Sequence, residues 1–143
     1  MYEEKQVFVN TGRYKLNGML TIPKGKTNAP LVVLVHGSGP GDMDETTFKN
    51  KPFKDIALGL AAKGIATLRY DKRTLVYGTQ MLKDSLHYTV NQETVEDAVS
   101  AVKLAKTFNN IDTSKVFLLG HSLGAMLAPR IATRAPRIAG VIC

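Results

Sequence analysis

Residues 120–125 are Gly120-His121-Ser122-Leu123-Gly124-Ala125, and the segments on either side of this stretch predict the fold. The four apolar residues before it, 116–119, indicate a buried strand. The small and apolar residues after it, 125–128, indicate a helix that begins at the stretch itself. A strand, a sharp turn and a helix in this order are typical of an α/β chain.

A serine stands at this turn, with one glycine two residues before it and another two residues after it. The G-x-S-x-G spacing is that of a nucleophile elbow, a strained strand-to-helix turn that exposes a serine hydroxyl. Gly120 and Gly124 suit the crowded corner because they carry no Cβ, and the start of a helix favours developing negative charge. The alternative is an ordinary helix N-cap serine. We predict that Ser122 is a nucleophile, which then needs an adjacent base because a free hydroxyl is barely ionised at neutral pH.

A second stretch places a glycine-rich turn after an early strand. Residues 31–35 are wholly apolar and lead into His36-Gly37-Ser38-Gly39-Pro40. Such a turn can direct backbone N–H groups at a substrate oxygen. Together the two motifs resemble the α/β-hydrolase family, and most closely its esterase and dienelactone-hydrolase-like members. The resemblance extends over nearly the whole chain, from about Val7 to Cys143.

The resemblance implies an oxyanion hole made of two backbone N–H groups, those of Leu123 and Ser38. Such donors stabilise the negative charge that develops on the substrate oxygen. The alternative for the second donor is that residues 37–39 are only a turn. The residues expected to support the nucleophile and the oxyanion hole lie in the two motifs: His36, Gly37, Gly39, Gly120, His121 and Gly124.

The three histidines are poor candidates for the base. By resemblance, His36 has a structural role and forms a hydrogen bond that fixes the glycine-rich turn. His121 is the sequence neighbour of the nucleophile, so its side chain should point away from Ser122, where it can line the pocket. His87 lies in an irregular stretch, 74–90, which we interpret as a flap near the site.

The rest of a catalytic triad is not found in its usual place. In this family the triad order along the chain is Ser, then Asp or Glu, then His. None of the 21 residues after Ser122 is Asp, Glu or His. The resemblance therefore places the acid and the histidine beyond Cys143, and we expect the isolated chain to be a very poor esterase.

The acidic residues before Ser122 are expected to have structural rather than catalytic roles. Asp71 follows a predicted strand, 65–70, and is expected to pair with a neighbouring lysine or arginine; a displaced triad acid is the alternative. Asp42, Asp44 and Glu45 are interpreted as a solvated loop.

The predicted element order is β-β-β-α-β-α-β-α-β, which indicates an α/β fold with a mostly parallel sheet and helices on both faces. Residues 1–143 are expected to form a single, incomplete α/β-hydrolase domain that stops after the strand following the nucleophile helix. Pro129 lies inside that last helix and is expected to kink it. The expected strands are 5–9, 14–22, 31–35, 65–70, 116–120 and 139–143, and the expected helices begin at Pro52, Thr89 and Ser122.

Composition excludes several classes of function. The net charge is +7, but no run of five basic residues occurs, which disfavours a nucleic-acid binder. The dispersed histidines and single cysteine give no metal-ligand pattern, and no phosphate-binding glycine motif occurs, so we expect no cofactor. The chain has no apolar run long enough to span a membrane and no signal peptide, which favours a cytoplasmic protein.

We therefore predict a serine hydrolase that cleaves a carboxylic ester, or a related peptide or thioester bond, in a small-molecule acyl substrate. The alternative is a non-catalytic binding or scaffold module of the same fold. The last strand, 139–143, is expected to leave a hydrophobic sheet edge through which two copies could form a homodimer.

Overall fold

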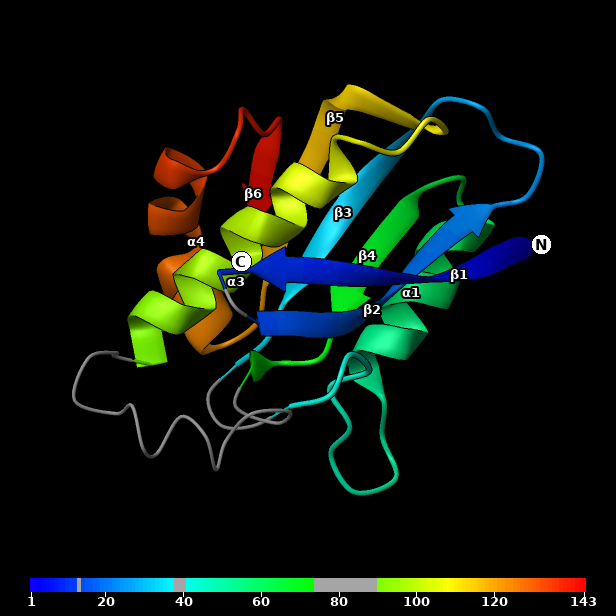
Figure 1. The fold of residues 1–143 in the computed structure, drawn as a ribbon. Coiled ribbons are helices and arrows are strands. Elements are labelled where there is room, and N and C mark those ends of the chain that lie inside the picture. The colour runs from blue at the N-terminus through cyan, green and yellow to red at the C-terminus, as the bar shows by residue number, and fades with distance from the viewer. Residues whose placement is uncertain (13, 38–40, 74–89) are drawn as a thin grey trace.

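The computed structural model describes residues 1–12, 14–37, 41–73 and 90–143 (Figure 1). Within these residues the strands form one sheet in the order β1-β2-β4-β3-β5-β6. The strands are β1 (Tyr2–Thr11), β2 (Tyr14–Pro23), β3 (Ala29–Val35), β4 (Ala66–Tyr70), β5 (Ile111–Gly120) and β6 (Gly140–Ile142). The helices are α1 (Pro52–Ala62), α3 (Val90–Ala105) and α4 (Leu123–Arg134).

The sheet has a parallel centre and an antiparallel margin. Strands β4, β3, β5 and β6 run parallel to their neighbours in that order, whereas β1 pairs antiparallel with β2, and β2 pairs antiparallel with β4. The predicted mostly parallel α/β sheet is therefore confirmed.

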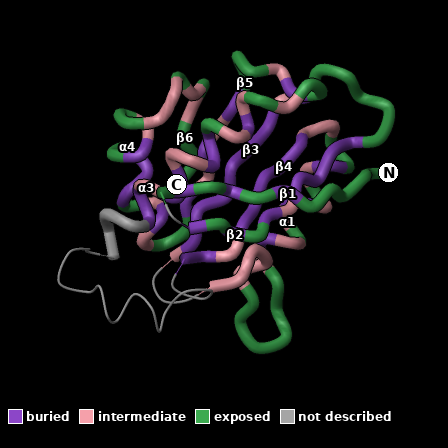
Figure 2. Tube along the Cα trace, viewed as in Figure 1, coloured by how far each residue is buried: buried purple, intermediate pink, exposed green. Residues whose placement is uncertain are grey.

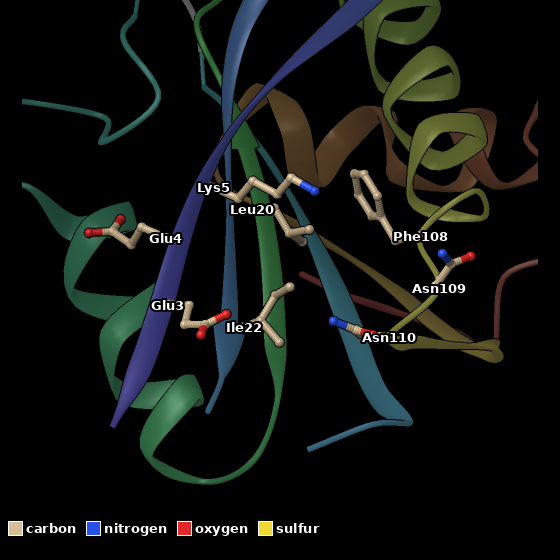
Figure 3. A pocket seen from close by; sticks show the side chains of 8 residues that line it. All are labelled: Glu3, Glu4, Lys5, Leu20, Ile22, Phe108, Asn109 and Asn110. Carbon is tan, nitrogen blue, oxygen red and sulfur yellow. The ribbon is translucent and has the colours of Figure 1, made fainter. Parts of the chain in front are cut away.

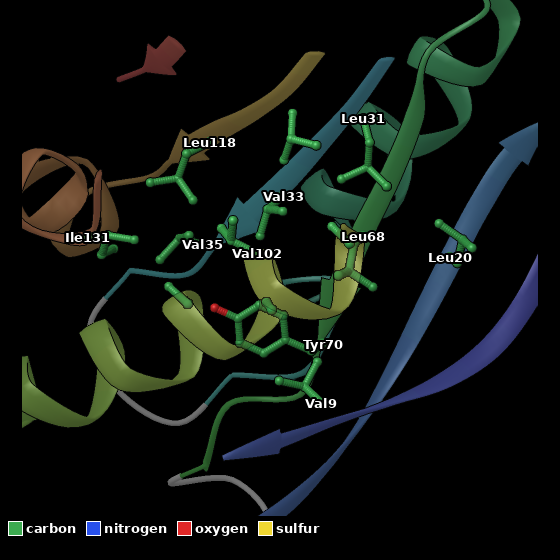
Figure 4. Close-up of a cluster of buried hydrophobic side chains, with 14 of the residues drawn as sticks. Val9, Leu20, Leu31, Val33, Val35, Leu68, Tyr70, Val102, Leu118 and Ile131 are labelled. Carbon is green, nitrogen blue, oxygen red and sulfur yellow. The ribbon is translucent and has the colours of Figure 1, made fainter. Parts of the chain in front are cut away.

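Strand β3 shows why helices cover both faces of this sheet. Its residues 31–35 are all buried, as a continuous apolar run in a parallel sheet requires (Figure 2). Leu31, Val33 and Val35 join the larger hydrophobic cluster, to which α3 and α4 contribute (Figure 4). Val32 and Leu34 face the other way and pack with residues of α1. Alternation along one strand thus places α3 and α4 on one face and α1 on the other.

Several elements differ from the predicted boundaries. Strand β5 begins at Ile111 rather than at 116, because Ile111 pairs with Ala29 of β3 although the intervening residues lack an apolar pattern. Strands β1 and β2 extend to Tyr2 and Pro23, because they pair along their full length as a hairpin. These strands are longer than predicted because their end residues pair through the backbone, although the side chains there show no apolar periodicity.

The end of β4 is joined to α3 by a buried ion pair. The Arg73 guanidinium donates to Asp97 Oδ1 at 2.6 Å, and the two side chains are only 2% and 3% exposed. Arg73 also donates to Thr11 Oγ1 at 3.2 Å and lies over the Tyr14 ring. One cation therefore connects β4, α3 and the β1–β2 hairpin. The predicted flap at 74–90, with His87, lies almost entirely outside the described residues.

Candidate active site

Ser122 occupies a strained corner between β5 and α4. Its backbone has φ 56° and ψ −113°, a conformation that L-residues rarely adopt and that costs on the order of 1–3 kcal/mol. The residue is exposed, and its side chain forms no capping hydrogen bond to α4. An ordinary N-cap serine would instead have an extended backbone and a side chain that accepts a helix N–H. Ser122 therefore stands at a strained strand-to-helix turn and does not act as an ordinary N-cap.

The two glycines of the motif are required by close backbone approaches. A Cβ at Gly120 would lie 2.4 Å from the carbonyl oxygen of Gly124, and a Cβ at Gly124 would lie 2.5 Å from the carbonyl oxygen of Val35. No side chain fits at such distances, so β5, α4 and the end of β3 can approach this closely only with glycine at both positions.

The second predicted motif lies directly beside the serine. A Cβ added at Gly37 would be 3.2 Å from Ser122 Cβ, and the His121 N–H donates to Val35 O at 3.1 Å. The structure thus brings the loop after β3 against the turn that carries Ser122. Ser38 and Gly39 lie outside the described residues, so the oxyanion donor at Ser38 stays a prediction. Leu123 is the first residue of α4, where backbone N–H groups have no intrahelical acceptor.

His36 is buried, with only 3% of its surface exposed. Its Nε2–H donates to the carbonyl oxygen of Asp42 at 2.8 Å, and its ring contacts the rings of Phe53 and Tyr70 at centroid distances of 5.5 and 5.3 Å. Burial lowers the pKa of His36 to about 4, so the imidazole is neutral near pH 7. This hydrogen bond joins His36, where the glycine-rich turn begins, to Asp42.

Two residues after β4, Asp71 and Lys72, also bind the segment between β3 and α1. The Lys72 ammonium, buried at 5% exposure, donates to Gly37 O at 2.7 Å, and its backbone N–H donates to Gly41 O at 2.8 Å. Asp71 Oδ1 accepts the Met43 N–H at 2.8 Å, and burial raises the pKa of this carboxyl group. The interpretation of Asp71 as an ion-pair partner of a neighbouring cation is wrong, since its carboxylate binds a backbone amide instead.

The interpretation of Asp44 and Glu45 as part of a solvated loop is also wrong. Asp44 accepts from the buried Arg69 guanidinium at 3.0 Å. Glu45 Oε2 lies 2.9 Å from His121 Nδ1 and accepts the Gly37 N–H at 3.3 Å. The sequence analysis did not assign Glu45 to the site. The available signal was charge complementarity: residues 42, 44 and 45 are acidic, and residues 69, 72 and 73 are basic.

The described residues hold no group of histidine, cysteine or carboxylate side chains that could bind a metal ion. Among these residues no helix is long and apolar enough to cross a membrane. A surface cavity of about 540 Å³ lies between β1, β2 and the segment that precedes β5 (Figure 3). It is lined by Glu3, Glu4, Lys5, Leu20, Ile22, Phe108, Asn109 and Asn110, none of which belongs to the predicted site.

A model of the alpha/beta hydrolase family matches residues 32–143, and the chain belongs to this family. The predicted family resemblance is thereby confirmed. The chain is also 54% identical over 134 residues to Esterase EstD of Thermotoga maritima. That alignment covers 94% of this chain but only 30% of the relative, so the chain spans less than a third of the length of this curated protein.

Solved structures share the fold at low sequence identity. The dienelactone hydrolase of Anabaena variabilis aligns over 97% of this chain and 62% of its own length, with a TM-score of 0.67 and 22% identity. The structure of DcsB in complex with its substrate analogue aligns over 99% of this chain and 45% of its own length, with a TM-score of 0.74 and 20% identity.

Proposed function

We propose that this chain carries the nucleophile and the oxyanion loop of a serine hydrolase that cleaves carboxylic esters. The observation that carries the proposal is the exposed Ser122 at a positive φ, with Gly37 packed against it. Membership of the hydrolase family supports the reaction class, and the name of the relative Esterase EstD supports an ester as substrate.

In the proposed reaction, Ser122 Oγ attacks the ester carbonyl carbon while its proton passes to a base. The carbonyl oxygen becomes an oxyanion, which the backbone N–H groups of Leu123 and Ser38 would bind. Each such donor is worth roughly 2.7–4 kcal/mol in the transition state. The alcohol then leaves with a proton, and water hydrolyses the acyl-serine to the carboxylic acid and free Ser122.

The base and the acid of the triad are proposed to come from sequence beyond Cys143. His36 is unsuitable as the base because it is buried and its Nε2–H is donated to Asp42 O. His121 Nδ1 is directed at Glu45. Without a base, turnover should fall about a million-fold, while binding and the oxyanion hole would keep roughly 10³–10⁴ over water.

Labelling with a fluorophosphonate probe tests the proposal, because this reagent reacts with an activated serine hydroxyl. Two polypeptides are compared: residues 1–143, and the same chain extended through the downstream coding sequence. We expect the extended polypeptide to be labelled at Ser122 and to hydrolyse 4-nitrophenyl acetate. Ser122→Ala should abolish both activities, whereas Ser100→Ala on α3 should change neither.

Two outcomes would contradict the proposal. An extended polypeptide that is folded but not labelled would favour the alternative, a non-catalytic binding or scaffold module. Rapid ester turnover by residues 1–143 alone, lost in Ser122→Ala, would refute the proposed location of the base.

A further inference from the structure

A single carboxylate oxygen binds both the turn that carries the predicted nucleophile and the loop that packs against it. Glu45 Oε2 accepts the Gly37 N–H at 3.3 Å and lies 2.9 Å from His121 Nδ1, which donates to it. Gly37 is the second residue after β3, and His121 directly precedes Ser122. Glu45, which lies between β3 and α1, therefore contacts both the residue that precedes Ser122 and the Gly37 peptide that packs against Ser122.

The surroundings of Glu45 indicate that this contact is built into the fold. Its side chain is only 14% exposed, so the carboxylate has lost most of its hydration and depends on these donors. Its backbone has φ 53°, a left-handed conformation that is uncommon for a residue with a long side chain. Strained backbone of this kind persists only where neighbouring contacts hold it, and it is concentrated at functional sites.

The turn that presents Glu45 is itself held by hydrogen bonds. The Glu45 N–H donates to Asp42 O at 3.0 Å, and Asp42 Oδ1 accepts the N–H groups of Asp44 and Thr46 at 3.1 and 2.8 Å. The Asp42 carbonyl also accepts from His36. Hydrogen bonds within residues 42–46 therefore fix the backbone from which the Glu45 side chain extends to the serine turn.

We propose that Glu45 is a positioning residue for the hydrolytic site, and this inference rests on the proposed function. Its carboxylate holds the Gly37 peptide against Ser122 through one hydrogen bond and the His121 side chain through another. Without it, the loop after β3 would lose its direct side-chain link to the serine turn. A displacement of about 1 Å at an active site can cost on the order of 100-fold in rate.

The test uses the extended polypeptide and four variants: Glu45→Ala, Glu45→Gln, His121→Ala and the double variant Glu45→Ala/His121→Ala. Glu45→Ala should slow Ser122 labelling and kcat by roughly 10–100-fold while KM changes less than about threefold, because the change affects positioning rather than ground-state binding. Glu45→Gln should recover part of the rate, since its amide oxygen can accept the Gly37 N–H.

The double variant examines whether the two side chains act through one contact. It should be no slower than Glu45→Ala, because residues that share an interaction have non-additive effects. Lys49→Ala is the matched control: Lys49 is an exposed residue farther along the same loop, and its removal should leave the rate and the unfolding temperature unchanged.

Amide hydrogen exchange of residues 1–143 tests the contact without any activity. Exchange of the Gly37 N–H should accelerate at least about tenfold in Glu45→Ala, while core amides such as those of Val33 and Leu118 keep their protection. Unchanged Gly37 exchange, or wild-type labelling by Glu45→Ala, would overturn the inference. Absent labelling of the wild type, with accelerated Gly37 exchange in the variant, would refute the proposed function and leave the contact in place with a structural role alone.

Discussion

Gly124→Ala is the most informative substitution at the corner that carries Ser122. The added methyl carbon would lie 2.5 Å from Val35 O, 2.6 Å from His36 O and 3.0 Å from Val35 C. Unstrained contacts between such atoms need roughly 3.5 Å, so the backbones must separate by about 1 Å. Strand β3 cannot move easily, because it is paired with β4 on one side and β5 on the other.

The expected result is that α4 shifts away from β3 and carries Ser122 with it. Overpacking of this kind typically costs about 1–3 kcal/mol, and in a chain of this size 1 kcal/mol lowers Tm by roughly 2–4 °C. We therefore expect a fall in Tm of about 2–12 °C. Labelling of Ser122 in the extended polypeptide should slow by on the order of 100-fold.

Gly59→Ala is the matched control for this substitution. Gly59 lies on the exposed side of α1, and a Cβ there would meet no atom within 4 Å. Alanine is favoured over glycine inside a helix by about 1 kcal/mol, so this variant should raise Tm by roughly 2–4 °C and label at the wild-type rate. Thermal unfolding followed by circular dichroism measures both variants. A Gly124→Ala protein with the Tm and the labelling rate of the wild type would refute the argument from close approach.

Three further predictions concern other parts of the molecule. Because the pKa of His36 falls from 6.5 in the unfolded chain to about 4 in the fold, the unfolded state binds more protons between these values. The contribution of His36 to stability should therefore rise by roughly 2.5 kcal/mol from pH 4 to pH 6.5, and urea titrations of His36→Asn should lack this part of the slope. Arg73→Met should lower the free energy of unfolding by about 3–5 kcal/mol in urea, because it leaves Asp97 buried without its partner. Strand β6 is an edge of the sheet with Val141 partly exposed, so we expect concentration-dependent self-association in sedimentation velocity that Val141→Lys reduces; identical monomeric profiles would contradict this.

Much of the fold could be predicted because its signals are local. The apolar run at 31–35 and the glycine spacing around Ser122 each lie within a few residues, so they identify a buried strand and a tight corner without any knowledge of the partners. The contacts of residues 42–45 could not be predicted in this way. Those acidic side chains resemble a solvated loop in sequence, and their partners Arg69 and His121 are distant in the chain.

The sequence alone determined that a serine would stand on a glycine-flanked turn after a buried strand, since a sharp turn needs small residues wherever it occurs. Only the tertiary structure determines which segment packs against that serine. The register of the central strands pairs Val35 with Gly120, so β3 and β5 end at the same level and Gly37 meets Ser122. Register depends on backbone hydrogen bonds between segments that are distant in the chain, and Glu45 reaches the same corner through its contacts with Gly37 and His121.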